Sequence, residues 1–83
     1  MNLEVTILSN LVYNEKYTRK VLPFLKADYF TDRSHKIIFL EIHEYISQYD
    51  ALPSLNALSI ECQERVDLSE EQFQTILETL NVL

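Results

Sequence analysis

The stretch from residue 32 to residue 49, DRSHKIIFLEIHEYISQY, carries the clearest helical pattern in the chain. Its apolar side chains recur at helical spacing in two adjacent rows, and Thr31 or Asp32 is placed to cap its start. An apolar face this wide predicts a central helix that several other helices contact. The rows consist of Ile38, Ile42, Tyr45 and Tyr49, and of His35, Phe39, Ile42 and Ile46, with Lys36, Glu41, Glu44 and Gln48 expected mostly on the opposite, polar side.

A helix is also predicted over residues 3–13, because apolar residues repeat there with a period of 3.6. Asn2 is a candidate N-cap, and Asn14 is a plausible stop, since asparagine tolerates the left-handed conformation. The expected inward-facing residues of this helix are Leu3, Ile7, Leu8, Leu11 and Val12.

A second, shorter helix is expected from Asn14 or Glu15, and it either ends near Leu22 or bends at Pro23, which lacks a backbone donor. Residues 26–32 contain turn formers but no regular period. We expect a loop or a single short turn there, which places Phe30 in the core.

Two helices are predicted after the central one. Ser54 is the expected N-cap of the fourth, and Ser69 with Gln72 forms a capping box at the start of the fifth. In the fourth helix Leu55, Leu58 and either Ile60 or Cys62 are expected to face inward, and in the fifth Phe73, Ile76, Leu77 and Leu80.

The 83 residues include no glycine, and no segment alternates with the period of a strand. The fold class predicted is therefore all-α, a single small globular domain of about five helices over residues 1–83. Helix ends must use Asn14, Asp50 and Asn81 where glycine is usual. The predicted core consists of Leu8, Phe30, His35, Ile38, Phe39, Ile42, Leu55 and Leu58.

The absence of glycine also excludes a phosphate loop and a dinucleotide fingerprint in these residues. His35 and His43 lie eight residues apart without a third ligand at metal spacing, so neither a metal nor another cofactor is expected. Cys62 lies between Glu61 and Gln63, close to Glu64, and acidic neighbours raise a thiol pKa. An enzyme is the least favoured class, because no catalytic constellation is present.

Charge is unevenly distributed along the chain, whose net charge is −6. Residues 1–36 hold six basic and four acidic side chains, whereas residues 37–83 hold nine acids and only Arg65 as a base. Tight direct binding of nucleic acid is therefore disfavoured, although a small helical DNA-binding domain stays a third possibility. No apolar run reaches the ~20 residues of a membrane span, and the start lacks a basic signal region, so no membrane contact and a cytoplasmic location are expected.

Protein-interaction residues are sought among the tyrosines and the charged faces. Tyr13, Tyr17 and Tyr49 lie near predicted helix ends, where amphipathic rings serve well in interfaces, although simple packing is the commoner role. A small basic patch near residues 16–20 is an alternative to an ordinary solvated face. The candidate partner-binding residues are Tyr13, Tyr17, Arg19, Lys20, Glu41, Glu44 and Tyr49.

Read in order, five segments form a recognisable string: LEVTIL at 3–8, VLPFL at 21–25, DYF at 28–30, HKIIFLEI at 35–42 and LPSLNAL at 52–58. This string resembles the N-terminal domain of DnaB-family replicative DNA helicases, in particular those of T-even-type phages. The resemblance covers about residues 3–80 and consists of apolar spacings with a few polar landmarks. The helical hairpin and the RecA-like motor of a full helicase are not part of these 83 residues.

The resemblance implies a non-catalytic collar domain that assists assembly of a hexameric ring and contacts the primase and possibly the helicase loader. The isolated domain is then expected to be a monomer or weak dimer, in the cytoplasm of an infected bacterial host. The alternative is a free-standing small phage protein that binds a helicase or primase as a regulator. A reading frame that continues into a motor would distinguish the collar domain from the free-standing protein.

Overall fold

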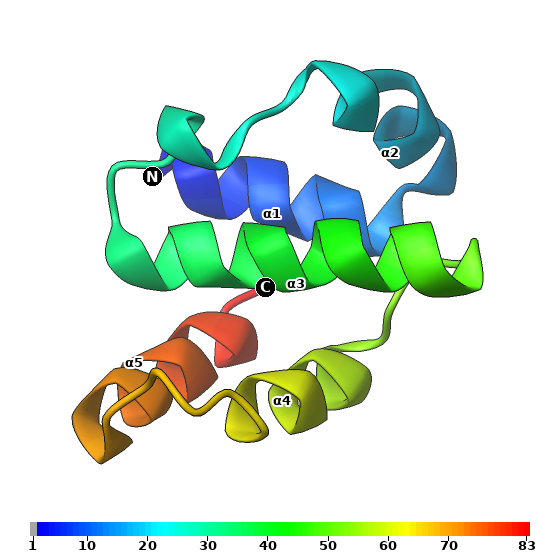
Figure 1. The fold of residues 1–83 in the computed structure, drawn as a ribbon. Coiled ribbons are helices and arrows are strands. Elements are labelled where there is room, and N and C mark those ends of the chain that lie inside the picture. Colours follow the sequence, from blue (N-terminus) through cyan, green and yellow to red (C-terminus); the bar gives the residue numbers. More distant parts are fainter. Residues whose placement is uncertain (1) are drawn as a thin grey trace.

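The computed structural model describes residues 2–83, which form five α-helices and two short 3₁₀ turns and contain no strand. This confirms the all-α fold of about five helices (Figure 1). The elements are α1 (Leu3–Tyr13), α2 (Glu15–Val21), η1 (Leu22–Phe24), η2 (Ala27–Tyr29), α3 (Arg33–Tyr49), α4 (Leu55–Gln63) and α5 (Glu70–Asn81).

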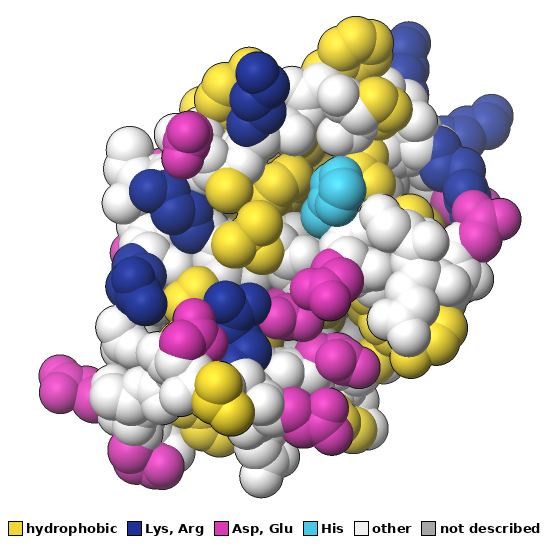
Figure 2. Space-filling view, viewed as in Figure 1, with side chains coloured by type: hydrophobic (Ala, Val, Ile, Leu, Met, Phe, Trp, Pro, Cys, Tyr) yellow, Lys and Arg dark blue, Asp and Glu magenta, His cyan; other side chains and the backbone are white. Residues whose placement is uncertain are grey.

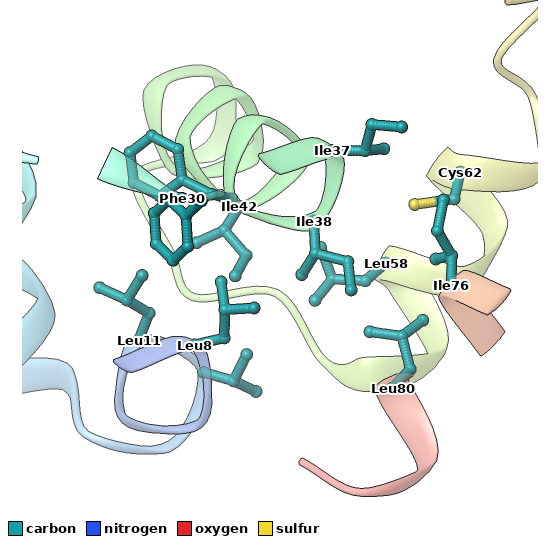
Figure 3. Packing of buried hydrophobic residues seen from close by; sticks show 12 residues of the cluster. Leu8, Leu11, Phe30, Ile37, Ile38, Ile42, Leu58, Cys62, Ile76 and Leu80 are labelled. Atoms are coloured by element: carbon teal, nitrogen blue, oxygen red, sulfur yellow. The ribbon is translucent and has the colours of Figure 1, made fainter. Parts of the chain in front are cut away.

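Helix α3 is the central element, as its broad apolar face predicted. In Figure 1 it runs across the middle of the molecule, with α1 and α2 above it and α4 and α5 below. Figure 3 shows Leu8 and Leu11 of α1 on one side of α3, and Leu58 and Ile76 from α4 and α5 on the other. The two halves of the chain therefore bury their apolar side chains against the same helix.

Most of the side chains expected in the core are buried in this cluster, with Leu55 half-buried at its edge. Within the fourth helix Cys62 is buried and Ile60 is exposed, which decides between the two alternatives. The expectation for Leu3 was wrong, because this side chain is 71% exposed and the buried stripe of α1 begins one turn later. The buried members of the predicted core are Leu8, Phe30, His35, Ile38, Phe39, Ile42 and Leu58.

The helix starts follow the predicted caps, whereas the helix ends differ from expectation at two positions. Asp50 ends α3 in the left-handed conformation with φ of 52°, as predicted. Asn14 does end α1, as predicted, but its backbone is extended, with φ of −119°, rather than left-handed. Its side chain accepts a hydrogen bond from the Tyr17 N–H and so also caps α2, which begins at the next residue. Asn81 is the last residue of α5, and Val82 follows it with φ of −100°.

The second helix ends near Leu22, which is one of the two predicted alternatives, and a short 3₁₀ turn follows it. Helix α2 ends at Val21, and the turn η1 continues the coil with Pro23 in its first positions, where a missing N–H costs nothing. Thr18 fixes the angle at which α2 leaves α1. This side chain is fully buried, and its hydroxyl lies 2.8 Å from the Leu11 carbonyl oxygen and 2.9 Å from that of Asn14.

A carboxylate clamp joins the start of α1 to the start of α3. Glu4 accepts hydrogen bonds from the Thr31 N–H at 3.0 Å and the Thr31 hydroxyl at 2.7 Å, and its other oxygen lies 2.8 Å from His35 Nδ1. These bonds hold the residue next to Phe30, whose ring stacks on Phe39 with centroids 5.1 Å apart. The clamp therefore fixes the turn that places Phe30 in the core.

The same bonds lower the pKa of Glu4 from its ordinary value of 4.5 to about 2, chiefly through the Thr31 N–H and then through His35. Because this pKa is lower in the folded chain than in the unfolded chain, the clamp stabilises the fold above about pH 4.5. That stabilisation is lost as the pH falls towards 2.

The substitution Glu4→Gln tests the clamp, because an amide keeps the shape but loses the charge and one acceptor. We expect a lower melting temperature at pH 7, and a smaller fall in melting temperature between pH 5 and pH 2 than in the unmodified chain. Melting curves followed by circular dichroism measure both. Glu15→Gln is the matched control, because the Glu15 side chain is 66% exposed. Equal pH slopes for Glu4→Gln and the unmodified chain would contradict the role of the clamp.

Candidate protein-interaction surface

The sequence-predicted interaction residues meet mainly at one end of the molecule. The end of α1, the whole of α2 and the end of α3 lie together at the right of Figure 1. We call this surface the tyrosine end and define it as Tyr13, Tyr17, Arg19, Lys20 and Tyr49. Tyr13 is 62% exposed and Tyr49 is 54% exposed, whereas Tyr17 packs partly against the core. Two large aromatic rings are therefore available for contact with a partner at this end.

Arg19 fastens the two sides of the tyrosine end to each other. Its guanidinium donates to the Asp50 carboxylate at 2.9 Å and to the Asp50 carbonyl at 3.0 Å, and it also reaches Glu15 at 3.3 Å. These partners raise the pKa of Arg19, the hydrogen bond to Asp50 most of all. Arg19 is thus engaged within the domain, while the neighbouring Lys20 is exposed.

A small hollow between α3 and α4 extends the surface beyond Tyr49. It is lined by Glu44, Tyr45 and Gln48 from α3 and by Glu61 from α4, together with Tyr49 and Glu41. The rings of Tyr45 and Tyr49 lie with their centroids 4.6 Å apart, tilted by 50°. The structure therefore brings Glu41, Glu44 and Tyr49 into one place, as members of an acidic and aromatic hollow.

Glu41 differs from the sequence expectation of a polar, solvent-facing residue. It is 7% exposed, and its carboxylate accepts a hydrogen bond from Arg65 Nη1 at 2.7 Å. Arg65 also binds Asp67 at 3.0 Å, and these partners raise the pKa of Arg65, Asp67 first. The apolar face of α3 is wide enough to include position 41, and a buried carboxylate needs a paired cation. Glu41 thus has a structural partner inside the domain.

Acidic and basic side chains occupy different parts of the surface. In Figure 2 acidic side chains gather over the later part of α3 and over α4, while basic side chains lie over α2 at the upper right and at the left. Glu44 and Glu64 are exposed on the acidic side, and Lys16 and Lys20 on the basic side. A partner that covers the tyrosine end meets both signs of charge, which favours one orientation of docking.

The candidate residues for catalysis or metal binding, His35, His43 and Cys62, have different surroundings in the structure. His35 is buried and bonded to Glu4, whereas His43 is exposed beside Phe39. The Cys62 thiol is buried, and burial, followed by the nearby Glu41, raises its pKa to about 11. A thiol with this pKa stays protonated at neutral pH and is a poor nucleophile. Within residues 2–83 no three potential ligands gather into a metal cluster.

None of the helices in residues 2–83 combines the length and the apolar character that crossing a bilayer requires.

Comparison with known proteins places the domain in a family. The family description "DnaB-like helicase N terminal domain" matches residues 1–82. The chain belongs to this family. A DnaB-like replicative helicase of Enterobacteria phage T4 is 35% identical over 54 residues, which make up 65% of this chain and 11% of that helicase. The resemblance seen in the sequence is thereby confirmed.

The DnaB-like N-terminal domain described here thus corresponds to a small part of the phage T4 helicase, since the match spans 11% of that protein. Its 83 residues include no glycine and hence no phosphate loop of the kind that an ATPase motor requires. The surface of the domain exposes tyrosine rings and carries acidic and basic side chains in separate areas.

Sequence reasoning missed the residues that complete this surface. The helical pattern places Tyr45 on the apolar face of α3, and no local pattern marks Glu61 or Asp50 as a neighbour of the candidate residues. One signal was available, because Arg65 is the only basic residue after position 36. A lone cation in such an acidic segment is a natural partner for a buried acid, although the sequence does not specify which of the nine acids it pairs with.

The substitution Arg65→Met tests the buried pair, because it leaves the Glu41 carboxylate without its cation. We expect the free energy of unfolding to fall by about 3 kcal/mol. The double variant Arg65→Met with Glu41→Met should regain a large part of this loss, since no charge then stays buried. Urea unfolding measures both effects.

Arg19→Met is the matched control, because it removes an arginine whose ion pairs are exposed. Its effect should be small. A double variant at positions 41 and 65 as unstable as the sum of its two single variants would contradict the buried-pair interpretation.

Proposed function

We propose that this chain is the non-catalytic collar domain of a phage replicative DNA helicase, which assists ring assembly and contacts the primase or the helicase loader. Membership in the DnaB-like helicase N-terminal domain family carries this proposal. The similarity to a replicative helicase of phage T4 supports the setting in DNA replication. The role of the domain is then recognition between proteins, while ATP hydrolysis belongs to a motor encoded beyond these 83 residues.

The tyrosine end is the proposed contact surface. Tyr13 and Tyr49 expose large rings at the ends of two helices, and tyrosine is enriched among residues that dominate binding energy. The backbone where α2 leaves α1 is held by the fully buried Thr18, whose hydroxyl bonds to the Leu11 and Asn14 carbonyl oxygens, so little ordering free energy is needed when a partner binds. Lys20 and Glu44 add charges of opposite sign for orientation.

The acidic balance of the second half of the chain favours a protein partner over DNA. Residues 37–83 carry nine acids against Arg65, and this base is already engaged with Glu41 and Asp67. Binding to a phosphate backbone draws its free energy from basic side chains that release counterions. We therefore propose that DNA is handled by other parts of the helicase.

A binding titration with the cognate primase tests the contact surface. We expect Tyr13→Ala and Tyr49→Ala each to weaken binding about tenfold, because each removes a ring from the centre of the proposed interface. Isothermal calorimetry or fluorescence anisotropy gives the dissociation constants.

Tyr29→Ala is the matched control. Tyr29 is 60% exposed, close to the 62% of Tyr13, but it lies on η2, at the opposite end of the molecule from α2 in Figure 1. Charge reversals Lys20→Glu and Glu44→Lys report on orientation, because neither side chain takes part in an ion pair within residues 2–83. Equal weakening by Tyr29→Ala, or none by either of the other tyrosine variants, would contradict the proposed surface.

We further propose that the isolated domain is a monomer or weak dimer, because the helical hairpin that pairs collar domains in such helicases lies outside these residues. Sedimentation velocity at tens of micromolar should show one slow species or a rapid exchange between monomer and dimer. A stable hexamer of this domain alone would overturn the proposal.

A further inference from the structure

The hollow between α3 and α4 is a small site built by two helices. It encloses about 20 Å³, which is space for a single group of the size of a water molecule. Glu44 and Tyr45 line it from α3, and Glu61 lines it from α4. Tyr49 and Glu41 complete the lining from α3. The hollow therefore combines carboxylates with aromatic rings.

Glu41 brings to the hollow one carboxylate oxygen that has no partner. The side chain is 7% exposed, and its Oε1 accepts a hydrogen bond from Arg65 Nη1 at 2.7 Å. Its Oε2 forms no hydrogen bond within residues 2–83. In the same residues no fully enclosed side-chain oxygen lacks a partner, so Oε2 opens to the surface at the hollow that Glu41 lines. A largely buried acceptor without a donor costs free energy, which a donor from a ligand recovers.

Negative charge exceeds positive charge around the hollow. The cation bonded to Glu41 is Arg65, which also donates two hydrogen bonds to Asp67 at 3.1 and 3.0 Å and so shares its charge between two carboxylates. Glu44 and Glu61 take part in no ion pair within residues 2–83, so their charges are not neutralised there. Figure 2 shows acidic side chains gathered over the later part of α3 and over α4. The hollow therefore attracts a cation.

The tyrosine pair and the size of the hollow narrow the choice of cation. The rings of Tyr45 and Tyr49 lie with their centroids 4.6 Å apart, and the face of an aromatic ring attracts a positive charge. Space for one water-sized group fits the compact ammonium of lysine, whereas the guanidinium of arginine is a larger, planar fork. Charge complementarity and size thus select a lysine side chain as the occupant.

We propose that this hollow binds the ammonium group of a lysine side chain from a protein partner. Glu41 Oε2 and the Glu44 carboxylate accept hydrogen bonds from the ammonium, and Glu61 adds attraction from α4. The rings of Tyr45 and Tyr49 contact the charge and the adjoining methylene groups. The inference rests on the proposed function, because Tyr49 belongs to the tyrosine end, and it specifies the chemistry of the partner at that surface.

The test titrates the ¹⁵N-labelled chain with an end-blocked hexapeptide of alternating lysine and alanine. We expect the peptide to shift the amide resonances of Glu44, Tyr45 and Glu61. Its counterpart with acetylated lysines, which lacks the charge, should bind at least about tenfold more weakly, and its arginine counterpart about threefold more weakly. Glu44→Gln, Glu61→Gln and Tyr49→Leu should each weaken binding of the lysine peptide about threefold.

Glu64→Gln is the matched control, because Glu64 is an exposed acid three residues after Glu61 that does not line the hollow. A loss of affinity in Glu64→Gln equal to that in Glu44→Gln would show general charge attraction and overturn the proposal. Equal binding of the acetylated or the arginine peptide would overturn it as well. Tighter binding of Mg²⁺ than of the peptide at the same amides would assign the hollow to a metal ion instead. Melting curves of each variant establish that it is folded.

The peptide titration does not require the primase, so the two proposals fail separately. Loss of primase binding in Tyr13→Ala, together with no amide shifts from the lysine peptide, would keep the tyrosine end as the contact surface and overturn the lysine site. The expected peptide binding, together with unchanged primase binding in Tyr13→Ala and Tyr49→Ala, would keep the lysine site and overturn the primase contact.

Discussion

The fold depends on one constraint, which is that both halves of the chain bury their apolar side chains against α3. Leu8 and Leu11 reach this helix from one side, and Leu58 and Ile76 from the other (Figure 3). A domain of this size has little surplus apolar area, so neither half has a second surface on which to form a core. Helix α3 therefore has to be long, apolar on a broad arc and fixed at both ends.

Polar contacts fix the elements around α3 once the core has formed. Glu4 joins the start of α1 to the start of α3, and Arg19 joins α2 to the residue that ends α3. Arg65 ties the link after α4 to Glu41 in the middle of α3. In each case a charged side chain bridges residues more than twenty positions apart. These polar contacts therefore help apolar packing to set how the elements are arranged.

The proposed contact surface follows from this arrangement, because α3 contributes to it. Its C-terminal end exposes Tyr49, directly before Asp50, which is bonded to Arg19 of α2. The chain belongs to the DnaB-like helicase N-terminal domain family, and the proposed function rests on that membership.

The sequence by itself determined the elements and their buried faces, because helical periodicity, N-caps and the absence of glycine are local properties. It predicted the capping box at Ser69, the left-handed Asp50 and the insertion of Phe30 into the core. Only the tertiary structure decided that Glu41 is buried and paired, and which tyrosines share a surface. These outcomes depend on residues distant in sequence, such as Arg65 beside Glu41 and Asp50 beside Arg19, whose pairing no local pattern specifies.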